Sequence, residues 1–209
     1  MNFTTTPQFL PPHTLNGSNC DAVLEITRKL RDMGNKQVYG LIDWDLKNTP
    51  EEQVIILGSG NRYAIENYIF EPHFVGLYLI HKKFTTPAEL GMADCNSYLD
   101  VINKVTTECD SLQILIDSVQ NKILWGSQEV SLVESELIDG TITTIRQEVL
   151  EMKGHDLEAK VKDTWPQLNS VRSNNGGDSA LKKDIINTVI NDFPGLCSKD
   201  LSTTFGEFK

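Results

Sequence analysis

The chain has 209 residues, four cysteines and a formal net charge of −10. That length suffices for one large domain or two small ones with a real hydrophobic core. The negative charge argues against a simple nucleic-acid-coating role, because it gives no general attraction to a phosphate backbone. It still allows an enzyme that holds its substrate through metal ions. The cysteines show neither CxxC nor Cys/His spacing, so neither a zinc site nor a disulfide framework is indicated.

Targeting signals are not recognisable in the sequence. The first residues, MNFTTTPQFLPP, lack a basic segment followed by an apolar one. No window approaches the ~18 apolar residues that a membrane helix needs. We therefore expect a cytoplasmic protein without a membrane partner.

The first predicted elements alternate between helix and strand. Residues 21–33 carry apolar side chains at helical spacing, and Gly34 follows as a stop signal. Residues 38–42, VYGLI, suit a buried parallel strand, and residues 54–58, VIILG, suit a second short strand. This order predicts an α/β fold with a parallel sheet and flanking helices.

From Pro87 onward the pattern changes to long segments with helical period. Residues 140–165 are predicted as further helix, broken around Gly154 and ended by Trp165-Pro166. We therefore divide the chain into an α/β portion, residues 1–86, and a mostly helical C-terminal region, residues 87–209.

Two aspartates stand where the first predicted strand runs out. Asp43 and Asp45 follow the apolar residues of YGLIDWD, and functional side chains of open α/β sheets gather at the carboxyl ends of strands. Residues two apart on an extended strand point to the same side. Two such carboxylates repel unless a cation lies between them, and Mg²⁺ or Mn²⁺ would supply that charge. The alternative is that one aspartate caps a turn and the other is solvated.

Glu66 is the third candidate residue. It lies in the otherwise apolar segment YAIENYIF, where a charge is costly unless it is paired or coordinates a metal. Its alternative interpretation is an exposed turn of a helix. If all three carboxylates converge, Asp43, Asp45 and Glu66 form a divalent-metal site.

Other residues point less clearly to a function. The histidines show no metal-ligand spacing, and we expect His73, His81 and His155 on the surface or in loops. The basic doublets Lys82-Lys83 and Lys182-Lys183 either lie on solvated surfaces or flank the path of a phosphate backbone. Neither GxxxxGK[ST] nor GxGxxG is present, so the sequence has no obvious nucleotide-phosphate cradle.

These residues resemble a known family. YGLIDWD, a short strand and YAIENYIF resemble the latter half of a Toprim domain, in particular that of overcoming-lysogenization-defect (OLD) nucleases and of related bacterial proteins that work beside ABC-type ATPases in phage defence. The segments MKGHDLEAKV, 152–161, and FPGLCSKDLSTTF, 193–205, also resemble helical-tail segments of those proteins.

The resemblance implies that Asp43 and Asp45 are catalytic metal ligands and that Glu66 is a further acidic site residue. The implied cofactor is Mg²⁺ or Mn²⁺, which would position the scissile phosphate and activate water. Toprim enzymes also carry an earlier glutamate at the end of their first strand, and no such motif precedes Asp43. The single upstream glutamate, Glu25, belongs to the solvated face of the predicted helix. The sequence is then either a shortened or a degenerate Toprim domain.

Three functions remain open at this stage. The first is metal-dependent hydrolysis of phosphodiesters in nucleic acid, DNA in preference to RNA, by a Toprim-type nuclease or the nuclease subunit of an ATPase-linked defence system. The second is a non-catalytic Toprim-like module that binds a partner ATPase. The third is a phosphatase or phosphotransfer enzyme built on the same carboxylates. An ABC-type ATPase partner and homo-oligomerisation both stay open.

Overall fold

The computed structural model describes residue 8 and residues 20–128, 130–171 and 179–206. Except for Gln8, the first nineteen residues of the predicted α/β portion lie outside the described residues. The described chain is mixed α/β, with helices predominating and two sheets of two strands each. Within the described ranges no helix is long and apolar enough to cross a membrane.

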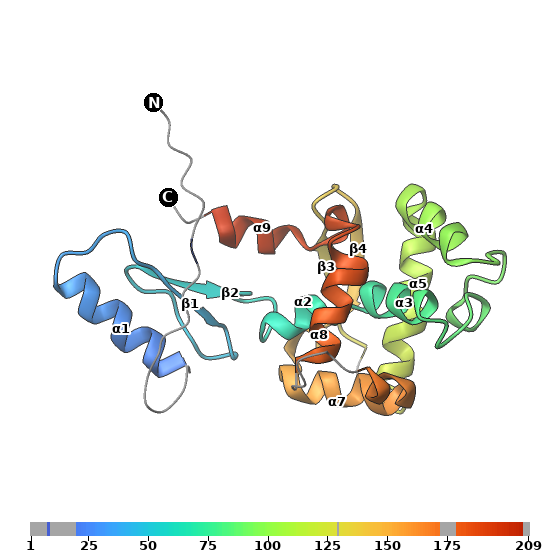
Figure 1. The fold of residues 1–209 in the computed structure, drawn as a ribbon, viewed down its shortest axis with the longest axis horizontal. Coiled ribbons are helices and arrows are strands. Elements are labelled where there is room, and N and C mark those ends of the chain that lie inside the picture. Colours follow the sequence, from blue (N-terminus) through green and yellow to red (C-terminus); the bar gives the residue numbers. More distant parts are fainter. Residues whose placement is uncertain (1–7, 9–19, 129, 172–178, 207–209) are drawn as a thin grey trace.

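A small α/β unit forms one end of the molecule (Figure 1). It contains helix α1, Cys20–Asp32, strand β1, Gly40–Asp43, and strand β2, Val54–Leu57. The two strands are parallel, with Gly40 opposite Val54 and Asp43 opposite Leu57. This confirms the predicted order of helix, strand and strand, although β1 begins at Gly40 rather than at residue 38.

Helix α1 packs closely on β1. A Cβ atom added to Gly40 would lie 2.7 Å from Oγ1 of Thr27, so the glycine permits this close approach. Beneath the helix a small hydrophobic cluster joins Ile42, Val54 and Ile56 to the partly buried Trp44. This cluster is separate from the main core of the protein.

The main core surrounds helix α3, Pro72–His81, from which nine residues, Pro72 to Ile80, are buried. Helices α4, Tyr98–Thr107, and α5, Cys109–Ile123, pack against it (Figure 1). At Gly76 an added Cβ would lie 2.8 Å from Cδ1 of Leu115, which shows how closely α3 and α5 approach. Helix α3 precedes residue 87 but shares this core with the helices that follow it. The domain boundary placed at residue 86 by the sequence therefore stays a prediction.

The remaining elements enclose this core. They are α2, Ile65–Ile69; the 3₁₀ segments η1, Ala88–Leu90, η2, Pro166–Ser170, and η4, Pro194–Leu196; β3, Leu132–Glu136; β4, Ile142–Arg146; α6, Gln147–Glu151; α7, Gly154–Thr164; α8, Ala180–Ile185; the π-helical segment η3, Ile186–Ile190; and α9, Lys199–Gly206.

The hairpin of β3 and β4 corrects the prediction that residues 140–165 are helical. β4 occupies residues 142–146 and pairs antiparallel with β3, while the helix begins only at Gln147. Gly140, at φ +89°, lies in the turn after Asp139. An Asp-Gly pair favours such a turn, because glycine adopts positive φ without steric cost. The predicted helix end is confirmed, since α7 ends at Thr164 before Trp165-Pro166.

Candidate functional site

Asp43 and Asp45 lie where the parallel sheet ends. Asp43 is the last residue of β1, and the backbone N–H of Trp44 still donates to the carbonyl of Leu57 at 3.1 Å. Asp45 and Leu46 then adopt positive φ angles of 51° and 56°. The strand alternation expected to align both carboxylates therefore stops at Asp43, because the chain turns directly after it.

The carboxyl group of Asp43 is partly buried beside the start of α2. Its Oδ1 atom accepts a hydrogen bond from the backbone N–H of Ile65 at 3.0 Å. The pKa of Asp43 is raised to about 6, mainly by burial and also by the negative charges of Glu66 and Asp45, whereas the hydrogen bond from Ile65 lowers it. Asp43 is therefore an acid whose charge is poorly compensated.

Glu66 is paired with a lysine from far along the chain. It lies in the first turn of α2, and its Oε1 atom accepts from Nζ of Lys182 at 2.9 Å, with both side chains about 15% exposed. Lys182 also lies 3.5 Å from Oε2 of Glu158, on α7. Burial opposes the charge of Lys182, but Glu66 and Glu158 raise its pKa overall. The charge on Glu66 is thus neutralised within the protein.

The start of α7 fits directly against Glu66. A Cβ atom added to Gly154 would lie 2.7 Å from Oε2 and 2.9 Å from Cβ of Glu66. Because the second contact is to an atom next to the backbone, it could not be relieved by rotation of the carboxylate alone. Because Gly154 has no side chain, it leaves the space that the side chain of Glu66 occupies.

The three predicted site residues are close enough for Asp45 and Glu66 to raise the pKa of Asp43. We call Asp43, Asp45 and Glu66 the acidic edge. Among the residues that the structure describes, however, no group of three or more His, Cys, Asp or Glu is arranged to hold a metal ion. The metal site stays a prediction. Glu25 is exposed and pairs with Lys29 at 2.5 Å on α1, which confirms its place on the solvated face.

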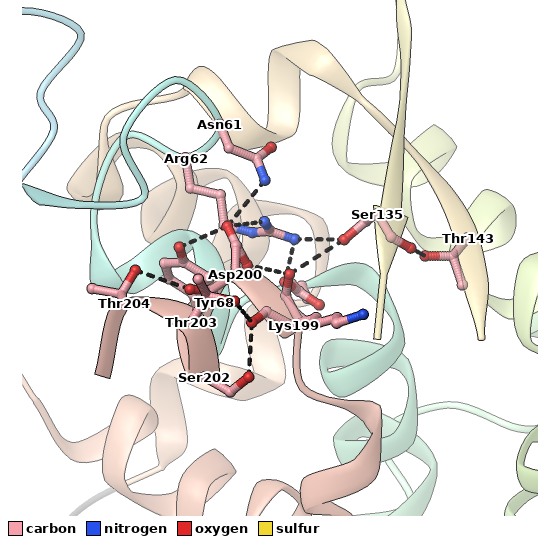
Figure 2. Close-up of polar contacts among 12 residues, drawn as sticks. Asn61, Arg62, Tyr68, Ser135, Thr143, Lys199, Asp200, Ser202, Thr203 and Thr204 are labelled. Atoms are coloured by element: carbon pink, nitrogen blue, oxygen red, sulfur yellow. Dashed lines mark hydrogen bonds and ion pairs between the residues drawn. The ribbon is translucent and has the colours of Figure 1, made fainter. Parts of the chain in front are cut away.

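A second polar cluster, which sequence reasoning missed, joins the loop after β2 to β3 and to α9 (Figure 2). The side chain of Arg62 is fully buried and contacts Glu71 at 2.7 Å and Asp200 at 2.9 Å. It also donates to Oγ of Ser135, on β3, at 2.9 Å, and lies over the ring of Tyr68. We call these five residues the Arg62 network.

Asp200 fixes helix α9 to this network. Its Oδ2 atom accepts from Asn61 at 3.0 Å and from the hydroxyl of Tyr68 at 2.9 Å, in addition to Arg62. Its Oδ1 atom accepts from the hydroxyl of Ser198. The C-terminal helix is therefore held to the loop after β2 by several charge-assisted hydrogen bonds.

Glu71 and His73 complete the buried cluster. Burial raises the pKa of Glu71 to about 7, although Arg62 opposes the shift. Burial lowers the pKa of His73 to about 4, so its ring is neutral at pH 7 and Nε2 donates to the carbonyl of Leu196 at 3.0 Å. The expectation that His73 lies on the surface or in a loop is wrong, because α3 is enclosed by the core on all sides.

Local sequence patterns contain little signal for these partners. Arg62 stands in a polar turn, where a solvated arginine is ordinary, and its partner Asp200 lies 138 residues later. Lys182 belongs to a basic doublet, but its contact with Glu66 spans 116 residues. Such pairs depend on how helices pack, which local periodicity does not specify.

Comparisons with protein-family models, with curated proteins and with solved structures found no match.

Proposed function

We propose that this chain is a Toprim-type, divalent-metal-dependent enzyme that hydrolyses phosphodiester bonds in nucleic acid, DNA in preference to RNA. The observation that carries the proposal is the state of Asp43. Its carboxyl group lies at the carboxyl end of a strand in a parallel pair, half-buried, with a pKa of about 6 and two further carboxylates nearby. A cation at this place would stabilise the charged carboxylate, which burial and, to a smaller extent, the neighbouring carboxylates disfavour.

The donor chemistry of the acidic edge fits a hard cation. Asp43 and Asp45 offer carboxylate oxygens, and Mg²⁺ commonly uses one or two protein carboxylates together with water and phosphate oxygens. Neither residue forms an ion pair with any described residue. Asp43 and Asp45 would therefore hold the ion, whereas Glu66 would first have to separate from Lys182. When bound, the ion would activate water and stabilise charge on the phosphate.

One basic side chain and one hydroxyl group beside the acidic edge support the same function. The charge of Lys182 is shared between Glu66 and Glu158, and its position beside Glu66 lets it orient a phosphate at the acidic edge. The hydroxyl of Tyr63 hydrogen-bonds Asp45, and partial burial together with Asp45 raises the pKa of Tyr63. Tyr63 therefore stays protonated and can hold Asp45 in position.

The experiment is a calorimetric titration of Mn²⁺ into the full chain at pH 7.5. We expect binding that is lost in D43N/D45N and retained in D163N, a control at an exposed carboxylate of α7 that has no ion pair among the described residues. Because the cation competes with a proton on Asp43, affinity should fall as the pH drops through about 6. Binding that is equal in the parent and in D43N/D45N would refute the metal site.

Cleavage is tested separately, on end-labelled DNA and RNA with Mg²⁺ or Mn²⁺. Metal-dependent products from the parent chain, absent with D43N/D45N, would support hydrolysis. Metal binding without any product would contradict the enzymatic proposal while leaving the metal site intact.

The second candidate is a non-catalytic Toprim-like module that binds a partner ATPase. The observation that favours it is the ion pair between Glu66 and Lys182, which neutralises a residue that the metal chemistry would use. Absence of both metal binding and cleavage, with a folded protein, would make this candidate the leading one.

A further inference from the structure

One edge of the β3–β4 hairpin is closed by side chains. In this antiparallel pair the backbone groups of Thr144 and Arg146 point away from β3. Gln113, on α5, accepts from the N–H of Thr144 at 2.8 Å and donates to its carbonyl at 2.9 Å. Gln120 accepts from the N–H of Arg146 at 2.9 Å. Two side-chain amides thus take the place of a neighbouring strand beside β4.

The opposite edge, along β3, is open over part of its length. The register places the backbone N–H and C=O groups of Leu132 and Glu134 on the side away from β4. These groups form no hydrogen bond with any described residue. Further along, Ile138 donates to the carbonyl of Cys197 at 2.9 Å, so the C-terminal segment pairs with the chain beyond β3 and then leaves it as α9.

A depression of about 300 Å³ lies between β3 and α9, where the two elements separate. Glu134 and Glu136 line it from the strand, and Lys199 and Thr203 line it from the helix. Figure 2 shows Lys199 and Thr203 on α9, with Ser135 on the neighbouring strand. The open backbone edge therefore borders a space that is accessible from solvent.

The depression is acidic. Glu134 forms no ion pair with any described residue, and Glu136 shares an exposed pair with Lys199 at 2.6 Å. Side chains of Leu132, Glu134 and Glu136 lie on the same solvent-facing side of the hairpin, since they are two residues apart. A strand added here would place its own alternate side chains beside these three.

We propose that the edge of β3 binds an extended peptide of another protein, antiparallel to β3, with basic residues opposite Glu134 and Glu136 and an apolar residue opposite Leu132. Main-chain hydrogen bonds provide the affinity in this mode of recognition, and the alternate side chains provide the specificity. A second copy of the chain fits poorly, because two-fold antiparallel pairing about Glu134 would put that carboxylate opposite itself.

The test uses the full chain and a fluorescein-labelled peptide, Thr-Lys-Thr-Lys-Thr-Leu-Thr, followed by fluorescence anisotropy. A second peptide has the same side chains but is N-methylated at both lysines and at the leucine, so it cannot donate backbone hydrogen bonds to β3. We expect the first peptide to bind and the second not to bind. Equal binding of the two, or no binding of either, would overturn the proposal.

Two variants locate the site on the protein. E134K should weaken binding of the first peptide roughly five- to tenfold, because it replaces an attractive cross-strand pair by a repulsive one. D163K, which changes the net charge equally at an exposed position on α7, should leave the affinity unchanged. Equal weakening in both variants would show that the peptide binds by non-specific electrostatic attraction, and it would overturn the proposed site. Sedimentation that shows a dimer dissociated by E134K would identify a second copy as the occupant instead.

Discussion

The acidic edge and the Arg62 network both bring carboxylates together, but they compensate them differently. Glu71 and Asp200 each contact Arg62, whose side chain is fully buried. Asp43 and Asp45 form no ion pair with any described residue and stay half-buried. An ion pair inside a core holds elements together, whereas carboxylates without an ion pair at a strand end leave charge available to a ligand. The two regions should therefore respond in opposite directions when a charge is removed.

The largest effect is expected from R62M. The substitution leaves Glu71 and Asp200 without their cation inside the protein, and breaking a buried ion pair in this way costs about 3–5 kcal/mol of the free energy of unfolding. Urea denaturation would measure the loss. R28M, which removes an exposed pair with Glu51 at 2.9 Å, should cost less than about 1 kcal/mol. A double variant, R62M/E71L, should be less destabilised than R62M, and equal or greater destabilisation would contradict the role assigned to the pair.

A smaller loss is expected from G154A. The added methyl group must displace Glu66, including its Cβ atom at 2.9 Å, and such overpacking costs about 1–2 kcal/mol. The same denaturation experiment would measure it, with G206A at the open end of α9 as the control, where an added Cβ meets nothing within 4 Å. If G154A is as stable as the parent, the close packing of α7 on Glu66 is not a constraint.

An effect no larger than that of G154A, but with the opposite sign, is expected from D43N without metal. The folded pKa of Asp43, about 6, lies above its ordinary value of 3.8, so the charged form destabilises the fold above pH 6. D43N should therefore be more stable than the parent by about 1–2 kcal/mol at pH 7, allowing for screening at this half-exposed group. The difference should shrink as the pH falls from 6 and vanish below about pH 4, where Asp43 is protonated in both states.

Urea denaturation of D43N and the parent at a series of pH values would check this sign. Lower stability of D43N at pH 7 would mean that the charge of Asp43 is compensated by a group outside the described residues, and the contrast with the Arg62 network would disappear.

Local sequence signals predicted the α/β unit better than the rest. The apolar runs before Asp43 and after Gln53 are too short for helices, and they form the parallel pair. In the hairpin, apolar residues from Leu132 to Ile145 also fit helical spacing, and the pair Asp139-Gly140 is the one local signal that favours a turn there. Such short segments are ambiguous until the turn is recognised. The contacts of Arg62 and Lys182 could not be predicted from the sequence, because they form only when segments that are distant along the chain pack together.

The distance between Arg62 and Asp200 along the chain also affects how the protein is made. The arginine is synthesised 138 residues before the aspartate that contacts it. Until α9 has left the ribosome, the segment around β2 cannot bury Arg62 with its full set of partners. Contacts of such separation form late and slowly, and a nascent chain with unfinished packing is prone to aggregation. Burial of Arg62 should therefore be completed only after α9 has been synthesised and released from the ribosome, rather than element by element before it.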